Sequence, residues 1–475
     1  MRDVFILLIC LCSLTSLSAQ QDMGFDEALS AMLENNSSVK AQQYGVDAAY
    51  NELRATRGLY LPKIDLIGGY TLLQRDVDVE LGGAKGVVSE SLNGFINKGV
   101  SSGLITSELA QLLAEGLSPL TSVDWRYTLQ RRSFGMIGAT LTMPIYMGGS
   151  INIANRVAKL TLDMAMYSLD AVENMLVTSL VERYYGVIVA RHVADVRQEV
   201  VRVMMQHLSD ATAMEEEGVI AHSEVVYVQY KLAEAERDMQ EAKNRVKVAE
   251  SALNALVGQS INPVGRIFLY KQIYSIDYYR DMADILNPIL CETKLGKQLS
   301  DEGVKLARAA LLPEVVAMGA ASLYSYQLSD IVPRWSVGIG VRIPLFDGLG
   351  KEHRYKAARS EAESVKYEVE NARSDIMLLV DKEYYTLQNR LFNIAANERA
   401  MALAESYYHS ASEGFREGVT SSTELMDACV EVAAAKVKYL NSAYEYCLSL
   451  ARLLEASGLS GTLINYVAQG EKVFI

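Results

Sequence analysis

The stretch Gly-Ala-Thr-Leu-Thr-Met-Pro-Ile-Tyr at residues 138–146 decides the fold, because Gly-Ile-Gly-Val-Arg-Ile-Pro-Leu-Phe stands 200 positions later, at residues 338–346. In each copy apolar and polar residues alternate up to a proline, which is the period of a β-strand. Other residues return at the same spacing: Tyr184-Tyr185 as Tyr384-Tyr385, Glu217-Gly218-Val219 as Glu417-Gly418-Val419, and Gly258 as Gly458. The sequence therefore predicts two copies of one structural unit.

A second spacing shows that the first copy is the longer one. Asn36 matches Asn287, and Leu61-Pro62 matches Leu312-Pro313, at an offset of 251 residues. The two offsets differ by 51 residues, so the first copy carries an insertion of that length between Pro62 and Pro144. We place these extra residues within the range 74–132, between two strands, and expect glycine-rich loops with a short helix at 107–114.

Very long helices flank the strands. Residues 150–257 and 349–457 contain no proline, and each range is interrupted by one glycine turn, at Gly218 and Gly418. Helical patterns of this length predict coiled-coil packing rather than a globular core. Strands are expected near residues 64–73, 134–146, 314–326 and 335–346. The changes between helix and strand are expected at Pro62, Pro144, Pro313 and Pro344, since proline does not continue a helix from its interior.

These elements give the expected organisation of the chain. A signal peptide covers residues 1–19, because an apolar run follows Met1-Arg2 and ends on small residues. The first repeat covers residues 20–258 and the second covers 284–460. A linker at 259–283 joins the repeats, helices at 24–57 and 284–310 precede the strands, and residues 461–475 form a C-terminal tail.

Composition and charge narrow the functional classes. The chain has 475 residues and a net charge of −13, which argues against a nucleic-acid partner. No segment after the signal has the roughly 18 uninterrupted apolar residues of a transmembrane helix. Three widely spaced cysteines, Cys291, Cys429 and Cys447, do not make a disulfide framework, and we expect them to be small buried side chains.

The alternating strands allow two interpretations. In the second copy Val337, Ile339 and Val341 share one face, while Gly338 and Gly340 share the other. A soluble sheet with one solvated face has this pattern, and so does a membrane barrel. The context favours the barrel, because only four strands are expected, in two pairs, between very long helices. Four strands cannot close a barrel, so a membrane sheet of this kind requires oligomerisation.

Leu-Pro before a strand, Pro-Leu-Phe-Asp-Gly at residues 344–348 after one, and Glu-Gly-Val between long helices resemble the TolC family of outer membrane channel proteins. The resemblance covers residues 24–460. It implies a homotrimer in the cell outer membrane, with four strands per protomer in a shared 12-stranded barrel and an α-helical tunnel in the periplasm. It also implies contact with outer membrane lipids, a periplasmic adaptor (membrane fusion) protein, and an inner membrane pump of RND, MFS or ABC type. Such channels serve efflux or type I secretion as passive ducts.

The resemblance also suggests an acidic ring at the periplasmic entrance. Glu424 and Asp427 match by position the paired acids that constrict the tunnel, although the first acid of the family is commonly Asp. They lie three residues apart and would share a helix face. Ordinary acids in a helix N-terminal turn, favoured by the helix dipole, explain them equally well. In the first repeat Glu224 occupies the matching place, but Tyr227 replaces the second acid.

The remaining candidate residues are few. Gly218, Val219, Phe415, Gly418 and Val419 are candidates for adaptor docking, or simply structural turns. Arg342 is expected in the barrel lumen, unless it is a surface arginine. No nucleophile with a base, cofactor motif or metal-ligand spacing is present, so the sequence does not predict an enzyme. The main rival to the channel is a periplasmic coiled-coil adaptor or structural protein without a membrane barrel.

Overall fold

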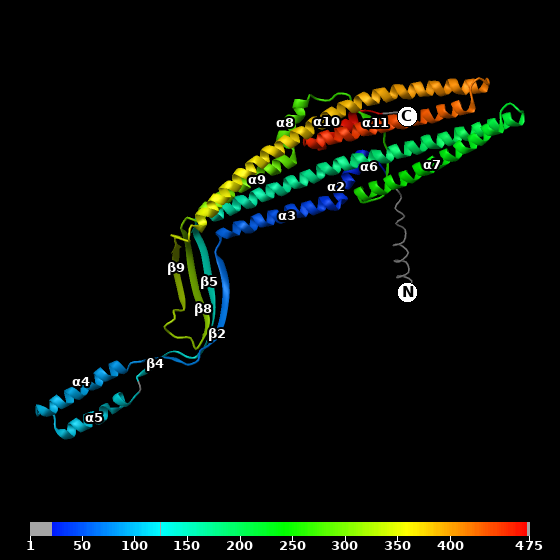
Figure 1. Ribbon diagram of the computed structural model, residues 1–475. Helices are drawn as coiled ribbons and strands as arrows, with labels where there is room; N and C mark the ends of the chain where they lie inside the picture. The colour runs from blue at the N-terminus through cyan, green and yellow to red at the C-terminus, as the bar shows by residue number, and fades with distance from the viewer. Residues whose placement is uncertain (1–20, 124, 473–475) are drawn as a thin grey trace, which may run out of the picture. The chain divides into compact units, whose positions relative to one another are not determined.

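The computed structural model describes residues 21–123 and 125–472, which form two compact units (Figure 1). The helical unit contains the residues up to 54, residues 155–305, and those from 355 onward. The strand unit contains residues 55–154 and 306–354. The expected signal peptide at residues 1–19 lies outside the described residues.

Two long helical hairpins dominate the helical unit. In the first hairpin, α6 (Ser150–Glu216) runs beside α7 (His222–Val257), and in the second, α10 (Gly350–Arg416) runs beside α11 (Ser422–Ala456) (Figure 1). Helices α6 and α10 each have 67 residues. At ~1.5 Å per residue each is about 100 Å long. None of the helices in the described part of the chain is long and apolar enough to cross a membrane.

The helices expected at 24–57 and 284–310 are each broken in two. Helices α2 (Phe25–Asn35) and α3 (Ser37–Arg57) meet at Asn36, while α8 (Ile276–Leu286) and α9 (Pro288–Ala309) meet at Asn287. The amide of Asn36 donates to the carbonyl of Leu256 at 3.1 Å, and that of Asn287 donates to the carbonyl of Ala456 at 2.8 Å. A side chain that binds backbone groups in this way competes with helix continuation, and each break occurs at the matching asparagine.

The largest hydrophobic cluster lies where these short helices pack on the hairpins. Tyr184 is buried there, and its hydroxyl donates to the carbonyl of Met23 at 2.8 Å. Its ring contacts Phe25 and Tyr185 edge to face. Aromatic residues give such a core much of its buried area, so this cluster is the rigid part of the helical unit.

Segments expected as linker and tail also join this region. Strand β1 (Gln21–Met23) pairs with β6 (Ile261–Pro263), and β7 (Phe268–Leu269) pairs with β10 (Glu471–Lys472). Helix α12 (Leu463–Gln469) precedes β10. The range 259–283 is therefore largely structured, and residues 461–472 are a short helix and strand rather than a free tail.

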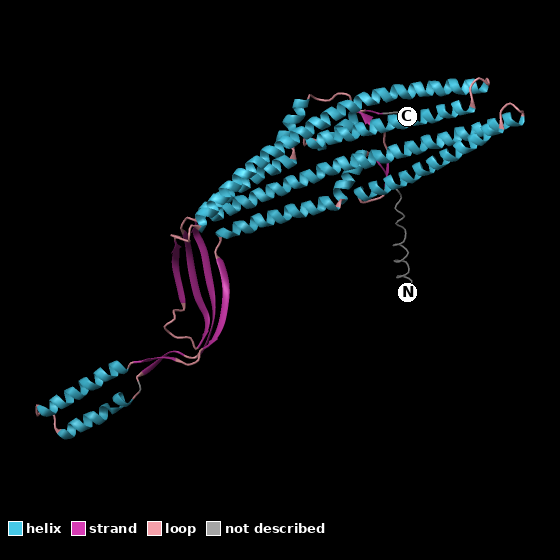
Figure 2. Ribbon diagram, viewed as in Figure 1, coloured by secondary structure: helices cyan, strands magenta, loops and turns pink. Residues whose placement is uncertain are grey.

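The larger sheet of the strand unit is antiparallel and has the strand order β2-β5-β8-β9 (Figure 2). The strands are β2 (Lys63–Leu72), β5 (Ser133–Met147), β8 (Glu314–Tyr326) and β9 (Trp335–Arg342). The register aligns Ile64, Leu141, Gly319 and Val337 in one row across the sheet. The next row is Asp65, Thr140, Ala320 and Ser336, on the opposite face.

The apolar face of this sheet is exposed in the described part of the strand unit. Its large side chains Ile64, Leu66 and Val337 are exposed, Val337 at 76 %. The outer edges of β2 and β9 have no strand beside them among the described residues. The sheet therefore presents both an apolar surface and two open edges, which are features that proteins normally avoid in water.

The four prolines stand near the ends of these strands. Pro62 and Pro313 directly precede β2 and β8. Pro144 lies inside β5, beyond the last pair with β2 and beside a shift in the β5–β8 register, where its missing N–H is tolerated. Pro344 follows the end of β9, which stops at Arg342, earlier than the expected residue 346.

The insertion contains more helix than its composition suggests. Strands β3 (Val77–Glu80) and β4 (Arg126–Gln130) pair with each other and carry two helices, α4 (Gly82–Ser101) and α5 (Ser107–Ser122). The expected glycine-rich loop is therefore wrong over residues 82–101. Helix propensity is a weak prior, and the isolated glycines of α4 do not stop the helix.

Candidate functional site

The turns that end α6 and α10 are built alike around a glycine. Gly218 and Gly418 have φ of 76° and 75°, a left-handed conformation that favours glycine. In the first turn the N–H of Val219 donates to the carbonyl of Met214 at 2.8 Å. These bonds satisfy carbonyls that a helix end leaves free, so each hairpin reverses within a few residues.

The valines of the two turns are exposed, whereas Phe415 is not. Val219 is 65 % exposed and Val419 is 80 % exposed. Phe415 packs with Leu425 and Ala428 of α11 in a small buried cluster. The valines can therefore meet a partner directly, while Phe415 can act only by supporting its turn.

The second hairpin resumes with a capped helix that carries the two acids. The hydroxyl of Ser421 accepts from the N–H of Glu424 at 3.2 Å, which caps α11. Leu425 and Met426 are buried, while Glu424 and Asp427 are exposed on the other side of the helix. Neither carboxylate forms an ion pair with a described residue. The structure thus brings the two acids together on one exposed face.

The first hairpin resumes differently. Ala221 stands at the N-cap of α7 and offers no side-chain oxygen. Glu224 is half-buried, and one of its carboxylate oxygens has no hydrogen-bond partner in the described residues. His222 and Glu215 pair at 2.7 Å across the turn. The first turn therefore lacks the exposed acidic pair of the second.

A buried histidine joins the two hairpins near their turns. The Nε2 of His207 on α6 lies 2.6 Å from the hydroxyl of Ser422 on α11, and both residues are buried. Burial lowers the pKa of His207, and Asp210 partly offsets that shift. The ring of Phe415 lies 4.7 Å from the imidazole ring. No local sequence pattern signals this pair, because its two residues come from different repeats.

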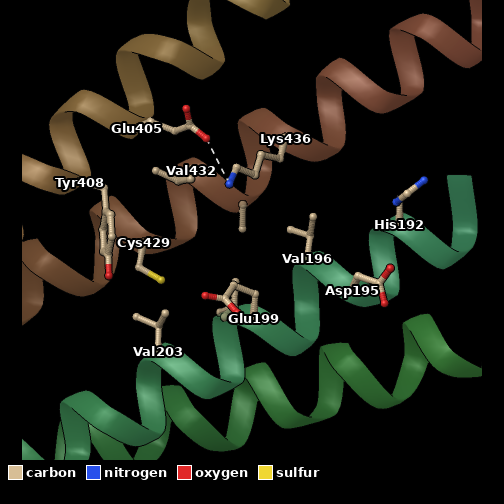
Figure 3. A pocket seen from close by; sticks show the side chains of 12 residues that line it. His192, Asp195, Val196, Glu199, Val203, Glu405, Tyr408, Cys429, Val432 and Lys436 are labelled. Carbon is tan, nitrogen blue, oxygen red and sulfur yellow. Dashed lines mark ion pairs between the residues drawn. The ribbon is translucent and has the colours of Figure 1, made fainter. Parts of the chain in front are cut away.

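A groove of about 600 Å³ runs between α6, α10 and α11 (Figure 3). Val196, Val203 and Val432 point into it, and Glu405 pairs with Lys436 at 3.1 Å on its rim. Burial raises the pKa of the Cys429 thiol to about 11, so this cysteine is an unreactive packing residue. Across residues 21–123 and 125–472, no group of three or more His, Cys, Asp or Glu side chains is arranged to hold a metal ion.

Arg342 lies on the polar face of the sheet. It pairs in register with Glu314, and its guanidinium is 3.9 Å from that carboxylate. The side chain is exposed. It thus shares a face with Asp65 and Thr140, opposite the apolar face.

Comparison with known proteins agrees with this architecture. The model of the outer membrane efflux protein family matches residues 28–259 and 280–459. Protein CyaE of Bordetella pertussis is 24 % identical over 364 residues, covering 72 % of this chain and 76 % of that protein. Outer membrane efflux protein BepC of Brucella suis is 21 % identical over 356 residues, covering 73 % and 75 %.

Solved structures share the fold. The CmeC outer membrane channel of Campylobacter jejuni superposes with a TM-score of 0.71 at 15 % identity, covering 92 % of this chain and 86 % of that one. The open state of the MtrE outer membrane channel of Neisseria gonorrhoeae gives 0.69 at 13 % identity, covering 92 % and 89 %. The family match extends over most of the sequence and over both hairpins. The chain therefore belongs to the outer membrane efflux protein family and is an outer membrane channel subunit of an efflux or secretion system.

Proposed function

We propose that three copies of this chain form one duct, with their sheets closed into a 12-stranded barrel. The observation that carries this proposal is the sheet with an exposed apolar face and two open edges, β2 and β9. Lipid tolerates the apolar face but not unpaired backbone groups, so the edges require strands from neighbouring copies. The polar face, with Asp65 and Arg342, then lines the lumen.

The two sequence repeats, residues 20–258 and 284–460, then contribute one long hairpin each to a tunnel in the periplasm. Glu424 and Asp427 of three copies would gather six carboxylates around its entrance. Crowded carboxylates attract cations. The exposure of both acids and their lack of partners among the described residues support this role.

The exposed valines of the turns are the surface that we assign to the adaptor. Val219 and Val419, each next to its glycine, contact the adaptor. Phe415 is buried and stabilises the second turn. An inner membrane pump of RND, MFS or ABC type supplies the energy, and substrate passes passively. Relatives named for efflux and for alkaline protease secretion suggest either small molecules or proteins as cargo.

Opening of the entrance would separate the ends of the two hairpins. Near the turns, small clusters such as Ala211, Val225, Val228 and Met426, together with the pair of His207 and Ser422, join the two hairpins. A change between two packings of these helix ends would open the tunnel like an iris.

The experiment is extraction of the mature protein from outer membranes, followed by measurement of its mass. The channel predicts recovery only in detergent, as a complex of three chains that dissociates on heating. A periplasmic coiled-coil adaptor, the rival function, predicts release in buffer without detergent. Recovery of the protein as a water-soluble monomer would contradict the proposal that three copies form a duct.

A further inference from the structure

The two-helix insertion, α4 and α5, has no core of its own. Between Gly82 and Ser122 none of the described side chains is buried. Leu92, Ile96 and Leu117 are half-buried. Phe95 remains 79 % exposed and Leu112 65 % exposed. A segment of about 40 residues rarely stays folded without further burial, so this hairpin needs a cover.

The apolar side of α5 is wider than α4 can cover. Leu109, Leu112, Leu113 and Leu120 follow helical spacing and are all exposed. Gln111 lies on the opposite, polar side of the helix. On α4, a Cβ at Gly86 or Gly94 would meet nothing within 4 Å. Both helices therefore keep open surface after they pack against each other.

The base of the insertion is fixed to the end of the sheet. The amide of Gln130 donates to the carbonyl of Gln327 at 2.7 Å, and the hydroxyl of Ser133 donates to the side chain of Gln327 at 3.0 Å. The N–H of Arg132 donates to Asp76 at 2.5 Å. The insertion therefore extends from the end of the sheet at which the β8–β9 turn lies. In a closed barrel the insertions of all copies would lie at the same rim.

We propose that the insertions of three neighbouring copies pack together as a six-helix bundle at the outer mouth of the barrel. This inference rests on the three-copy barrel of the proposed function. That barrel places three identical insertions around one axis, so apolar surfaces turned toward this axis meet one another. Packing of this kind would continue the contact between β2 of one copy and β9 of the next that the proposed barrel requires.

The charge of the hairpin favours a second copy over a lipid surface. Its charged residues are Lys85, Glu90, Lys98, Glu108 and Glu115. Two lysines among three acids do not form the cationic cluster that binds an anionic membrane surface. Apolar helices with few, balanced charges instead suit packing against copies of themselves.

The test uses cysteine cross-linking in the full-length protein in isolated outer membranes. Leu112→Cys places a thiol on the open apolar side of α5, and Gln111→Cys places one on the polar side as the matched control. The unsubstituted protein controls for Cys291, Cys429 and Cys447. A short bismaleimide joins two thiols, so Leu112→Cys, with one introduced thiol per chain, should give cross-linked dimers on the order of tenfold above Gln111→Cys, because contact is confined to the apolar side.

The mass of the complex in detergent distinguishes failure of the three-copy barrel from failure of the six-helix bundle. A monomer in every variant would remove the three-copy barrel itself. An intact trimer in which Leu112→Cys is modified without cross-linking, or cross-links no better than Gln111→Cys, would overturn the bundle alone. Protection of Leu112→Cys in membranes but not in the detergent trimer would also overturn it, in favour of a lipid surface. If Leu112→Cys fails to assemble, Leu109→Cys on the same side replaces it.

Discussion

The two hairpins are alike where they meet the short helices and at the glycine of each turn, but they differ in the residues beside the turns. Asn36 and Asn287 break the chain in the same way, each bound to the end of its own hairpin. Near the turns, Glu215 stands where the second hairpin has Phe415, and Ala221 stands where it has Ser421. The asparagine bonds, which occur in both hairpins, stabilise the shared fold. The residues that differ beside the turns indicate that the two turns have different functions.

The largest difference between the two hairpins is expected when Phe415 and its counterpart Glu215 are each replaced by alanine. Phe415→Ala should remove about 3 kcal/mol of local packing, because it empties a small buried cluster. Glu215→Ala, its counterpart, should cost less than about 1 kcal/mol, since it loses only an exposed pair with His222. Hydrogen exchange of the residues around each turn measures both. Equal protection losses would show that the second turn is not specially supported.

Replacing the asparagine at either helix break should destabilise the protein. Asn287→Ala should lower the free energy of unfolding by about 2 kcal/mol, because the buried carbonyl of Ala456 and the N–H of Leu290 both lose their partner. Asn36→Ala is expected to cost about 1 kcal/mol, because its bonds are less buried. Thermal loss of helical circular dichroism in detergent checks both. A larger loss for Asn36→Ala would contradict the account.

The acidic residues test whether the difference between the two hairpins affects ion conduction. Glu424→Gln combined with Asp427→Asn should weaken block of the pore by divalent cations, on the order of tenfold, if the six carboxylates gather at the entrance. Glu224→Gln is the matched control from the first hairpin and should leave the block unchanged. Single-channel currents at rising Mg²⁺ measure it. Unaltered block in the double variant would remove these acids from the entrance.

The smallest effect is a pH dependence of the contact between α6 and α11. Because burial lowers the pKa of His207, its contribution to packing is complete above the ordinary value of about 6.5 and is lost as pH falls toward the folded-state pKa. Asp210, Arg202 and Arg416 line the same cavity, and the attraction of Asp210 for the proton moderates the shift.

Lowering the pH from about 7.5 to 5 should therefore increase the time that the channel spends open, by a factor of a few. The His207→Gln variant should lose this dependence while it conducts normally at neutral pH. Open probability in single-channel recordings is the readout. The same pH response in His207→Gln would place the titrating group elsewhere.

Much of the fold follows from the sequence because its repeats are local patterns. The alternation before Pro144 and Pro344 predicts strands, and proline-free ranges predict hairpins, whose observed bounds lie close to the expected ones. The family and its outer membrane location, inferred from the same patterns, are confirmed. Cys429 and Cys447 are buried and unpaired, as predicted, while Cys291 is only half-buried.

Tertiary contacts explain what the sequence could not show. The breaks at Asn36 and Asn287 depend on carbonyls more than 160 residues away. The pair of His207 with Ser422 joins the two repeats, and no pattern within one helix signals it. Phe415 stands next to an exposed turn in sequence but is buried by α11. Helix α4 forms although its glycines favour a loop.

The central claim is that three chains pool their four-stranded sheets into one sealed conducting barrel. Single-channel recording in a planar lipid bilayer tests it most directly, with detergent-purified protein whose mass has been verified as three chains. The account predicts discrete, reproducible current steps of one size class, carried mainly by cations. A verified three-chain complex that inserts into the bilayer but gives no current steps would contradict it.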